Sequence, residues 1–254
     1  ISGSGGLTKA GVSTLYLSGD NTYDGVTTVS SGAIRISHPH ALGSTLGGTL
    51  VAADPHRLEL SGGITVSNEA VTIIGKGNNN GALQVVSGSN TWAGPVILGA
   101  ADARVGVTPS NGVLVVAGVI SDGANTNSFV VRNADNGGPT ILTSTNAYKG
   151  ETKVIVGTLR LAAGDDRLPT NTVVRLGNSS NIATATLDLS GCNQTVAGIT
   201  QDGTTMARKI VNSETSLVST LTVNTRSAYT YSGSLSGNLR SEERRVGKEC
   251  RSRW

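Results

Sequence analysis

The sequence contains little of what several protein classes require. Of its 254 residues two are cysteine, one is methionine, one is phenylalanine and six are proline, and aromatic residues make up 3%. So few cysteines exclude a disulfide-stapled domain, and the longest apolar run, Val113–Ile120, is far shorter than the roughly 20 residues of a membrane-spanning helix. The chain begins without methionine or a charged-then-apolar leader, so we expect a mature chain or an internal fragment.

Helical periodicity is also lacking, whereas short alternating strands are frequent. No stretch of about a dozen residues combines a 3.6-residue apolar period with capping residues. In Leu15–Leu17, Leu58–Leu60 and Leu187–Leu189 the leucines alternate with an outward residue, the two-residue period of a half-buried strand. We therefore predict an all-β chain.

The net charge of +3 does not describe most of the chain. Residues Arg240–Trp254 hold six Lys and Arg against three Glu, which leaves fourteen charges of each sign in residues 1–239. A basic excess usually indicates an anionic partner, but here it is confined to one end. We therefore expect no nucleic-acid partner.

Three interpretations of Arg240–Trp254 are open: a solvated charged tail, a nucleic-acid or localisation patch, and a segment that is not native. All fifteen residues resemble the translation of a common sequencing adaptor, and the composition changes abruptly at this point. We favour the third interpretation. We expect residues 1–239 to form one repeat region, incomplete at both ends, and 240–254 to be a disordered non-native tail. Cys192 then has no partner in the chain.

The sequence repeats itself at an interval of 125 residues, since Leu17–Ile36 aligns without gaps to Leu142–Leu161. We call this repeated segment the cassette. A weaker copy begins at Asn90, and a second element, L-x-L-S-G, starts at Leu15, Leu58 and Leu187. The identical cassette positions are Asn21/Asn146, Tyr23/Tyr148, Gly25/Gly150, Thr27/Thr152, Val29/Val154, Gly32/Gly157 and Arg35/Arg160.

The cassette predicts a strand, a turn and a second strand. In the turn N-x-[Y/W]-x-G we expect the Asn to tolerate a left-handed conformation, the Gly to supply a positive φ, and the aromatic ring to cover the corner. Restarting a cassette is typical of a solenoid, in which each coil stacks on the one before. We predict a right-handed parallel β-helix, pectin-lyase-like, with roughly ten coils of about 20–25 residues.

Gly3–Ile36 closely resembles the autotransporter-associated β-strand repeat of bacterial autotransporter passengers. Ser13 replaces a Gly of that pattern and Ile34 a Leu, and Asn133–Pro139 replaces the lead-in of the second copy. The matching residues are Gly3, Leu7, Lys9, Gly11, Leu15, Leu17, Ser18, Gly19, Asn21, Tyr23, Gly25, Thr27, Val29 and Gly32. The resemblance implies an exported β-helical stalk at the cell surface, associated with the outer membrane through a C-terminal barrel beyond this fragment.

Candidate metal ligands are few. His38 and His40 could share a strand face, with His56 and Asp54 nearby, but Pro39 favours a loop and no four-ligand spacing appears. We expect no metal site and no cofactor.

Candidate catalytic groups are also few. Asp165 and Asp166 lie near Arg160 and Arg167, yet no histidine motif accompanies them, and general acid–base chemistry needs convergent groups. A solvated turn is the favoured interpretation, so we expect no catalytic residue.

Weaker motifs do not change this expectation. Asp20–Gly25 partly resembles a calcium loop, but the other cassette copies lack its Asp residues, and Ile74–Gly81 lacks features of a P-loop. Asn178 and Asn193 begin glycosylation sequons of the kind that polar chains meet by chance.

Two function classes remain. The first is a non-enzymatic structural or adhesive surface module, whose partners would be glycans or proteins of a host or environmental surface. The alternative is a glycan-active enzyme, a polysaccharide lyase or hydrolase, on the same β-helix scaffold, which needs a concave site with convergent carboxylates. Stackable coils are evident and convergent carboxylates are not, so we predict the first class.

Overall fold

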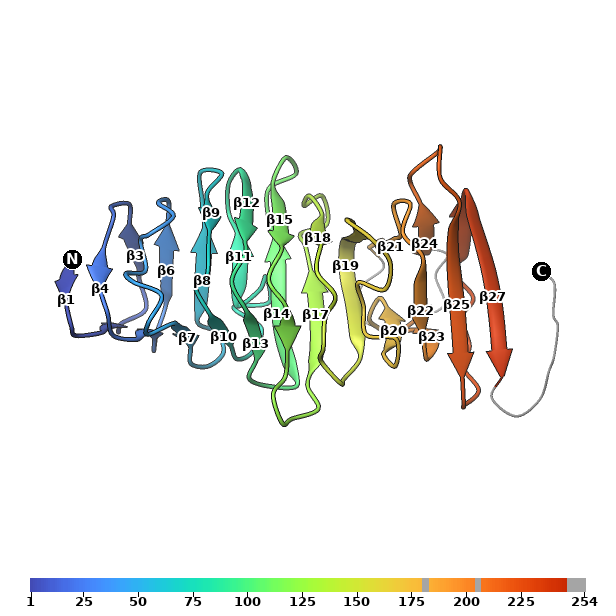
Figure 1. Cartoon of the computed structure of the whole chain (residues 1–254), viewed down its shortest axis with the longest axis horizontal. Helices are drawn as coiled ribbons and strands as arrows, with labels where there is room; N and C mark the ends of the chain where they lie inside the picture. Colours follow the sequence, from blue (N-terminus) through green and yellow to red (C-terminus); the bar gives the residue numbers. More distant parts are fainter. Residues whose placement is uncertain (180–182, 204–206, 246–254) are drawn as a thin grey trace.

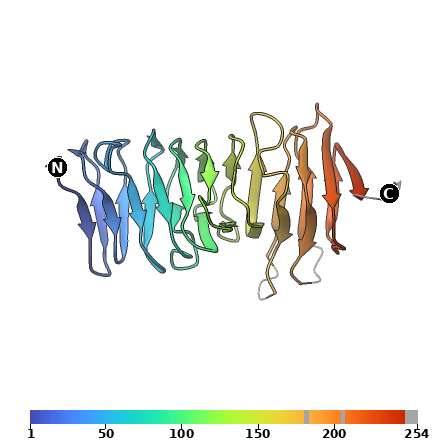
Figure 2. The ribbon, with the colours of Figure 1, turned by 60° about the horizontal axis from the view of Figure 1, so that its bottom comes forward.

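The computed structural model describes residues 1–179, 183–203 and 207–245. They form 27 short strands stacked into a solenoid of about ten coils, and every strand pairing in these ranges is parallel. The described residues form a rod with β1 and β27 at opposite ends, and successive coils lie side by side in both views (Figure 1, Figure 2). Within the described ranges there is no α-helix, and so none that could span a membrane. The predicted all-β solenoid is confirmed.

Each coil contributes strands to up to three sheets, which we call faces 1 to 3. Face 1 contains β2 (Leu7–Lys9), β5 (Thr27–Val29), β7 (Thr49–Val51), β10 (Val71–Ile73), β13 (Val96–Leu98) and β16 (Ile120–Ser121). Face 2 contains β3 (Thr14–Leu17), β6 (Ala33–Ile36), β8 (Arg57–Leu60), β11 (Leu83–Val85), β14 (Asp102–Val107), β17 (Ser128–Arg132), the first part of β19 (Thr152–Leu161), β20 (Val173–Leu176) and β23 (Gly198–Gln201).

Face 3 and two smaller sheets complete the rod. Face 3 contains β9 (Thr65–Val66), β12 (Ser89–Trp92), β15 (Val113–Val116), β18 (Thr140–Leu142), the last part of β19, β21 (Ala185–Asp188), β24 (Arg208–Asn212) and β26 (Ser234–Gly237). The smaller sheets pair β1 (Ser2–Gly3) with β4 (Thr22–Tyr23), and β22 (Gln194–Val196) with β25 (Ser219–Thr225) and β27 (Leu239–Arg245).

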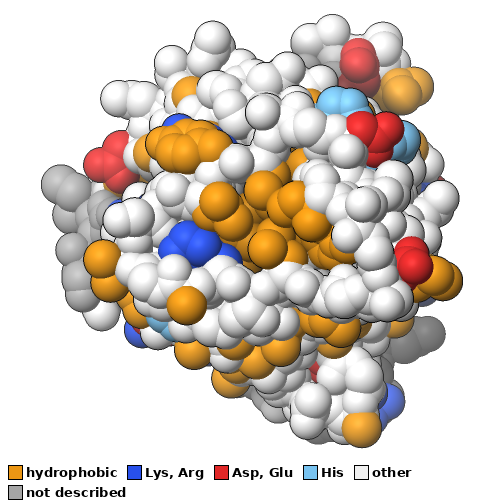
Figure 3. Space-filling model, turned by 90° about the vertical axis from the view of Figure 1, so that its left-hand side faces the viewer, with side chains coloured by type: hydrophobic (Ala, Val, Ile, Leu, Met, Phe, Trp, Pro, Cys, Tyr) orange, Lys and Arg blue, Asp and Glu red, His pale blue; other side chains and the backbone are white. Residues whose placement is uncertain are grey.

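The core is a set of apolar ladders that run along the rod. On face 2, seven apolar residues of successive coils pair in register and are fully buried, because alternate side chains of each strand point inward. Figure 3, which looks onto the N-terminal end, shows apolar side chains at the centre of the coil. The face-2 ladder consists of Ile34, Leu58, Leu83, Val105, Val131, Val154 and Leu176.

Coil length varies more than the sequence predicts. The pairing of Thr14 with Ala33 closes a short coil, whereas the pairing of Leu159 with Leu187 closes a much longer one. The extra residues lie in loops between strands, because the strands pair in register apart from one shift between Val131 and Arg132 in the pairing of β17 with β19. Long surface insertions cost a solenoid little when the stacked backbone is preserved.

The two full copies of the cassette lie on different faces. Thr27–Val29 belongs to face 1, whereas the equivalent Thr152–Val154 belongs to face 2. The second strands differ in the same way, with Ala33–Ile36 on face 2 and Gly157–Leu161 on face 3. The interval between the copies therefore corresponds to five coils and about one third of another.

The cassette asparagines act through their side chains and not through a left-handed backbone. Asn146 is buried, and its Oδ1 accepts the backbone N–H of Ile120 at 2.7 Å while its Nδ2 donates to the carbonyl of Arg167 at 2.8 Å. One side chain thus joins the coils on both sides of its own. Asn21 accepts a hydrogen bond from the ammonium group of Ile1 and donates to the carbonyl of Ala41, and none of the cassette asparagines has a positive φ. The expected left-handed role was wrong, because the corner needs a bridge between coils.

The turn glycine has a different role from the one predicted. Gly25, Gly94 and Gly150 have no positive φ. A Cβ at Gly94 would lie 2.0 Å from the carbonyl oxygen of Glu69 in the preceding coil, so the close approach of two backbones requires glycine there. Positive φ occurs later in the cassette, at Gly157, where β19 bends from face 2 to face 3.

Part of the segment expected to be disordered forms a strand. Residues 240–245 belong to β27, which pairs with β25 from Leu239 to Arg245. Backbone hydrogen bonds explain this difference, because the exposed edge of a coil can pair with almost any extended chain. Residues 246–254 lie outside the described part of the chain. The non-native origin of 240–254 stays a prediction.

Candidate functional site

The outward arginine of the cassette is anchored by an acidic residue of the next coil. Nε of Arg35 lies 2.7 Å from Oε2 of Glu59, and Nε of Arg160 lies 2.8 Å from Oδ2 of Asp188. Each pair occupies facing positions of adjacent strands, so the bond is part of the stacking register. Both carboxylates are almost completely buried, with 2% and 3% of their side chains exposed.

These ion pairs were not predicted from the sequence, although the sequence contains a pattern that indicates them. The central residue of each L-x-L-S-G element contacts the cassette arginine: Tyr16 stacks on Arg35 at 5.3 Å, and Glu59 and Asp188 form the ion pairs. The cassette repeats an arginine, and the L-x-L-S-G element repeats an acidic residue at its central position. Because the two positions lie about one coil apart in the sequence, the pattern indicates pairing between coils.

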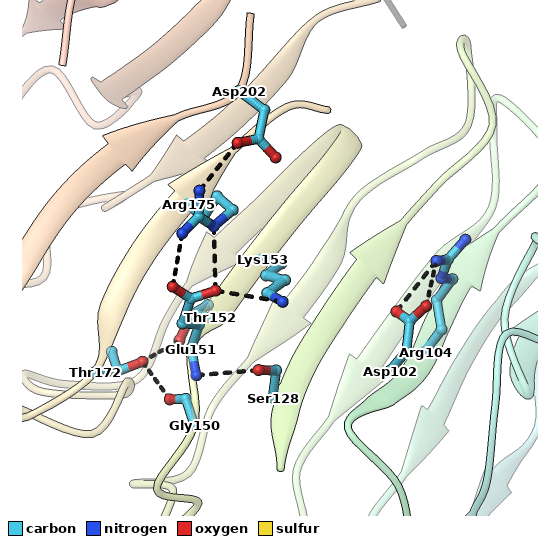
Figure 4. Close-up of polar contacts among 10 residues, drawn as sticks. All are labelled: Asp102, Arg104, Ser128, Gly150, Glu151, Thr152, Lys153, Thr172, Arg175 and Asp202. Carbon is cyan, nitrogen blue, oxygen red and sulfur yellow. Dashed lines mark hydrogen bonds and ion pairs between the residues drawn. The ribbon is translucent and has the colours of Figure 1, made fainter. Parts of the chain in front are cut away.

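A second charged network lies on face 2, further along the rod (Figure 4). Arg175 donates from Nη2 to Glu151 at 2.9 Å and from Nη1 to Asp202 at 3.0 Å, and Nζ of Lys153 lies 3.3 Å from Glu151. The hydrogen bond and charge of Arg175, with a contribution from Lys153, lower the pKa of the Glu151 carboxyl below its usual value. The network links three successive coils, and its carboxylates form ion pairs with Arg175 and Lys153.

Asp165 and Asp166, the candidate catalytic pair, both face the next coil. Asp165 accepts the backbone N–H and side-chain amide of Asn193, at 2.8 and 3.1 Å, and Asp166 accepts the backbone N–H of Thr195 at 2.8 Å. Arg160 pairs with Asp188 instead of joining them. The arrangement holds the turn to its neighbour, as a structural role requires.

A shallow open groove of about 280 Å³ lies beside this turn. It runs between the cassette corner of one coil and the loop of the next, and both polar and apolar groups line it. The lining residues are Thr145–Lys149, Asp166 and 168–171.

The structure groups the candidate metal ligands differently from the sequence-based expectation. His38 and His40 lie together with Asp20 of the preceding coil, which the sequence analysis assigned to a calcium-like loop. Asp54 is directed elsewhere, since its Oδ1 accepts the backbone N–H of Lys76 at 3.0 Å.

The other motifs have structural surroundings. Asp24 of the calcium-like loop accepts the hydroxyl of Ser44, and the amide of Asn193 binds Asp165. The Ile74–Gly81 segment is a turn closed by the Gly81 N–H on the carbonyl of Lys76. The other sequon, at Asn178, extends into residues outside the described ranges. Among the described residues Cys192 is a free, buried cysteine.

Comparison with known proteins gives a family match at the two cassettes. The model of the passenger-associated transport repeat matches residues 7–36 and 136–161. A curated relative is the adhesin BmaC autotransporter of Brucella suis biovar 1 (strain 1330), 26% identical over 227 residues. The two cassettes are therefore similar to the repeats of autotransporter passengers. The alignment covers 74% of this chain but 6% of the relative, so the chain spans a small part of that protein. No solved structure matches the chain.

The match to the passenger-associated transport repeat coincides with a structural unit. Residues 7–36 run from β2 to β6, and residues 136–161 run through β18 and β19. Both stretches therefore end on the strand that carries the paired arginine, Arg35 or Arg160. The repeat thus supplies both the corner that joins coils and one half of the ion pair.

Proposed function

We propose that this chain is a non-enzymatic stalk segment, displayed at a bacterial surface, whose exterior contributes to adhesion. The observation that carries the proposal is the face-2 ladder, which continues from coil to coil without interruption over Ile34–Leu176. A continuous core in a quasi-one-dimensional array gives length and stiffness, which a stalk requires.

The charged groups support the same proposal. The carboxylates of Glu59, Glu151, Asp188 and Asp202 form ion pairs with arginine side chains of adjacent coils. Asp165 accepts a hydrogen bond from a turn of the next coil. Groups used in this way stabilise stacking, whereas a glycoside hydrolase needs an acid and a base positioned at the scissile bond. The adhesive part of the proposal is supported by the name of the relative. Surface glycans or proteins of a host or environment are the proposed partners.

Adhesion is tested with beads that carry the complete chain on epithelial cell layers. We expect more beads to attach than with albumin-coated beads, and soluble chain to compete. Treating the layer with glycosidases or with protease separates glycan from protein partners. Attachment equal to that of albumin beads would contradict an adhesive role.

The non-enzymatic part is tested by incubation with polygalacturonate and hyaluronan, measuring new reducing ends and the ultraviolet absorbance of unsaturated products. We expect no turnover. Turnover that disappears in Asp165→Asn or Glu151→Gln, with an unchanged circular dichroism spectrum, would show the glycan-active alternative.

A further inference from the structure

Three metal-ligating side chains from two successive coils meet near the N-terminal end. Asp20 lies in the turn between β3 and β4, and His38 and His40 follow β6 in the next coil. One ligand atom of each lies within 4.8 Å of the other two, and Nδ1 of His40 is 3.3 Å from Oδ1 of Asp20. In Figure 3 two histidines lie against one acidic side chain at the rim of this end, in agreement with the cluster.

The backbone holds these groups in place. The N–H of Asn21 donates to the carbonyl of His40 at 3.0 Å, and the buried Nδ2 of Asn21 donates to the carbonyl of Ala41 at 2.7 Å. Asp20 is therefore fixed beside His40 by the same corner asparagine that joins the coils. The N–H of Ala41 bonds to the carbonyl of His38 at 3.1 Å, which closes the turn that contains both histidines.

We propose that Asp20, His38 and His40 bind a divalent transition-metal ion, with Zn²⁺ as the representative ion. Two imidazoles and one carboxylate with an open fourth position form a donor set that suits Zn²⁺, Cu²⁺ and Ni²⁺. Bonds of about 2.0–2.2 Å place tetrahedral donors roughly 3.4 Å apart, close to the 3.3 Å between His40 and Asp20.

The third donor needs only a local adjustment. Nδ1 of His38 accepts the backbone N–H of His40 at 3.2 Å. Coordination through this nitrogen replaces that hydrogen bond and leaves the N–H to water, because His40 is exposed. Asp20 is also exposed, so its carboxylate can rotate towards the ion. The site would connect the exposed turns of two adjacent coils.

The sequence could not locate this site, because its third ligand, Asp20, precedes both histidines by almost a full coil and belongs to another turn of the solenoid. The nearer candidates do not join it: Asp54 binds the backbone of Lys76, and His56 is not in the cluster. His56 therefore supplies a matched control.

The experiment uses the complete chain without a polyhistidine tag. Titration with ZnCl₂ is followed by calorimetry, and Cu²⁺ is followed by electron paramagnetic resonance. We expect one ion per chain, a higher melting temperature with Zn²⁺, and hyperfine splitting from two nitrogen donors. Asp20→Asn, His38→Ala and His40→Ala should each weaken binding at least tenfold, and His38→Ala should reduce the splitting to one nitrogen. His56→Ala should bind as the parent chain does.

Unchanged circular dichroism in each variant shows that the coils remain folded. Non-saturable binding by the parent chain would overturn the proposal. So would binding that survives all three substitutions, or that is lost equally in His56→Ala.

Discussion

Arg160 and Asp188 bind each other across a coil boundary, with Nε 2.8 Å from Oδ2, and they occupy facing positions of β19 and β21. Asp188 also accepts the backbone N–H of Ser190 and both the N–H and hydroxyl of Ser213. A buried carboxylate is thus surrounded by donors from its own coil and from the coils before and after it.

We expect Asp188→Asn to lower the free energy of unfolding by about 3 kcal/mol, because it leaves donors unmatched in a buried site. Arg160→Gln should cost less, about 1 kcal/mol, because 38% of the arginine side chain is exposed. Urea unfolding followed by far-ultraviolet circular dichroism measures both. Arg226→Gln, at an exposed position, is the control, and an equal loss in all three variants would refute the pairing.

A methyl group at the turn glycine should disrupt stacking. In Gly94→Ala the new Cβ meets backbone atoms of the preceding coil at 2.0 Å, so we expect a loss of about 2–3 kcal/mol or more. Gly19→Ala is the matched control, since nothing lies within 4 Å of its added Cβ and its φ is not positive. The midpoints of urea unfolding should separate the two variants; similar midpoints would contradict the close approach.

Removing a corner asparagine should loosen two coil boundaries together. Asn146→Ala deletes hydrogen bonds to Ile120, Ser144 and Arg167, and we expect a loss of about 2–3 kcal/mol. Hydrogen exchange of the Ile120 amide should accelerate, because that N–H loses its acceptor. The control is Asn136→Ala at an exposed position, and an Ile120 amide that remains protected in Asn146→Ala would rule out the bridge.

Stability should depend on pH in opposite ways at two glutamates. The lowered pKa of Glu151 means that its pairing stabilises the fold above the usual value of 4.5 and that this contribution is lost as pH falls through the lower folded value. We expect Glu151→Gln to cost about 0.5–1 kcal/mol at pH 7, since both partners are about one third exposed. The cost should shrink in acid, as measured by urea unfolding at several pH values.

Glu69 should give the opposite dependence of stability on pH, because the pKa of its carboxyl is raised and not lowered. Burial raises the pKa of its carboxyl, partly offset by the hydrogen bond from Thr49, so its contribution is largest in acid and is lost as pH rises through the folded value. The loss in free energy of unfolding caused by Glu69→Gln, relative to the parent chain, should therefore be greatest at low pH. Parallel pH profiles for the two variants would contradict the assignment.

The fold could be predicted because its signals are local. Alternating leucines define strands within a single short segment, and the restarted cassette indicates stacking, so composition and periodicity were enough. The contacts between coils could not be predicted, because the sequence separation of paired residues changes from coil to coil and the loops set it. The Arg35–Glu59 pair and the Asp20–His40 cluster both depend on that separation.

The cassette corner contains a side-chain contact that a comparison of the cassette copies could have revealed. The phenol of Tyr23 lies 2.6 Å from the hydroxyl of Thr27, and Tyr148 and Thr152 form the same contact. In the weaker copy Trp92 and Val96 stand at these positions, and Trp92 Nε1 is buried without a hydrogen-bond partner. Both positions change together, which is the pattern expected of two side chains in contact.

The placement of the two cassettes on different faces also affects what the rod presents to its surroundings. Equivalent side chains, such as Arg35 on β6 and Arg160 on β19, point in directions separated by about a third of the circumference. If the interval recurred, each further copy would advance by one face, and a given direction would be revisited only at every third copy. Identical motifs would then be distributed helically, so that the rod offers the same chemistry on all sides whichever way it lies against a surface.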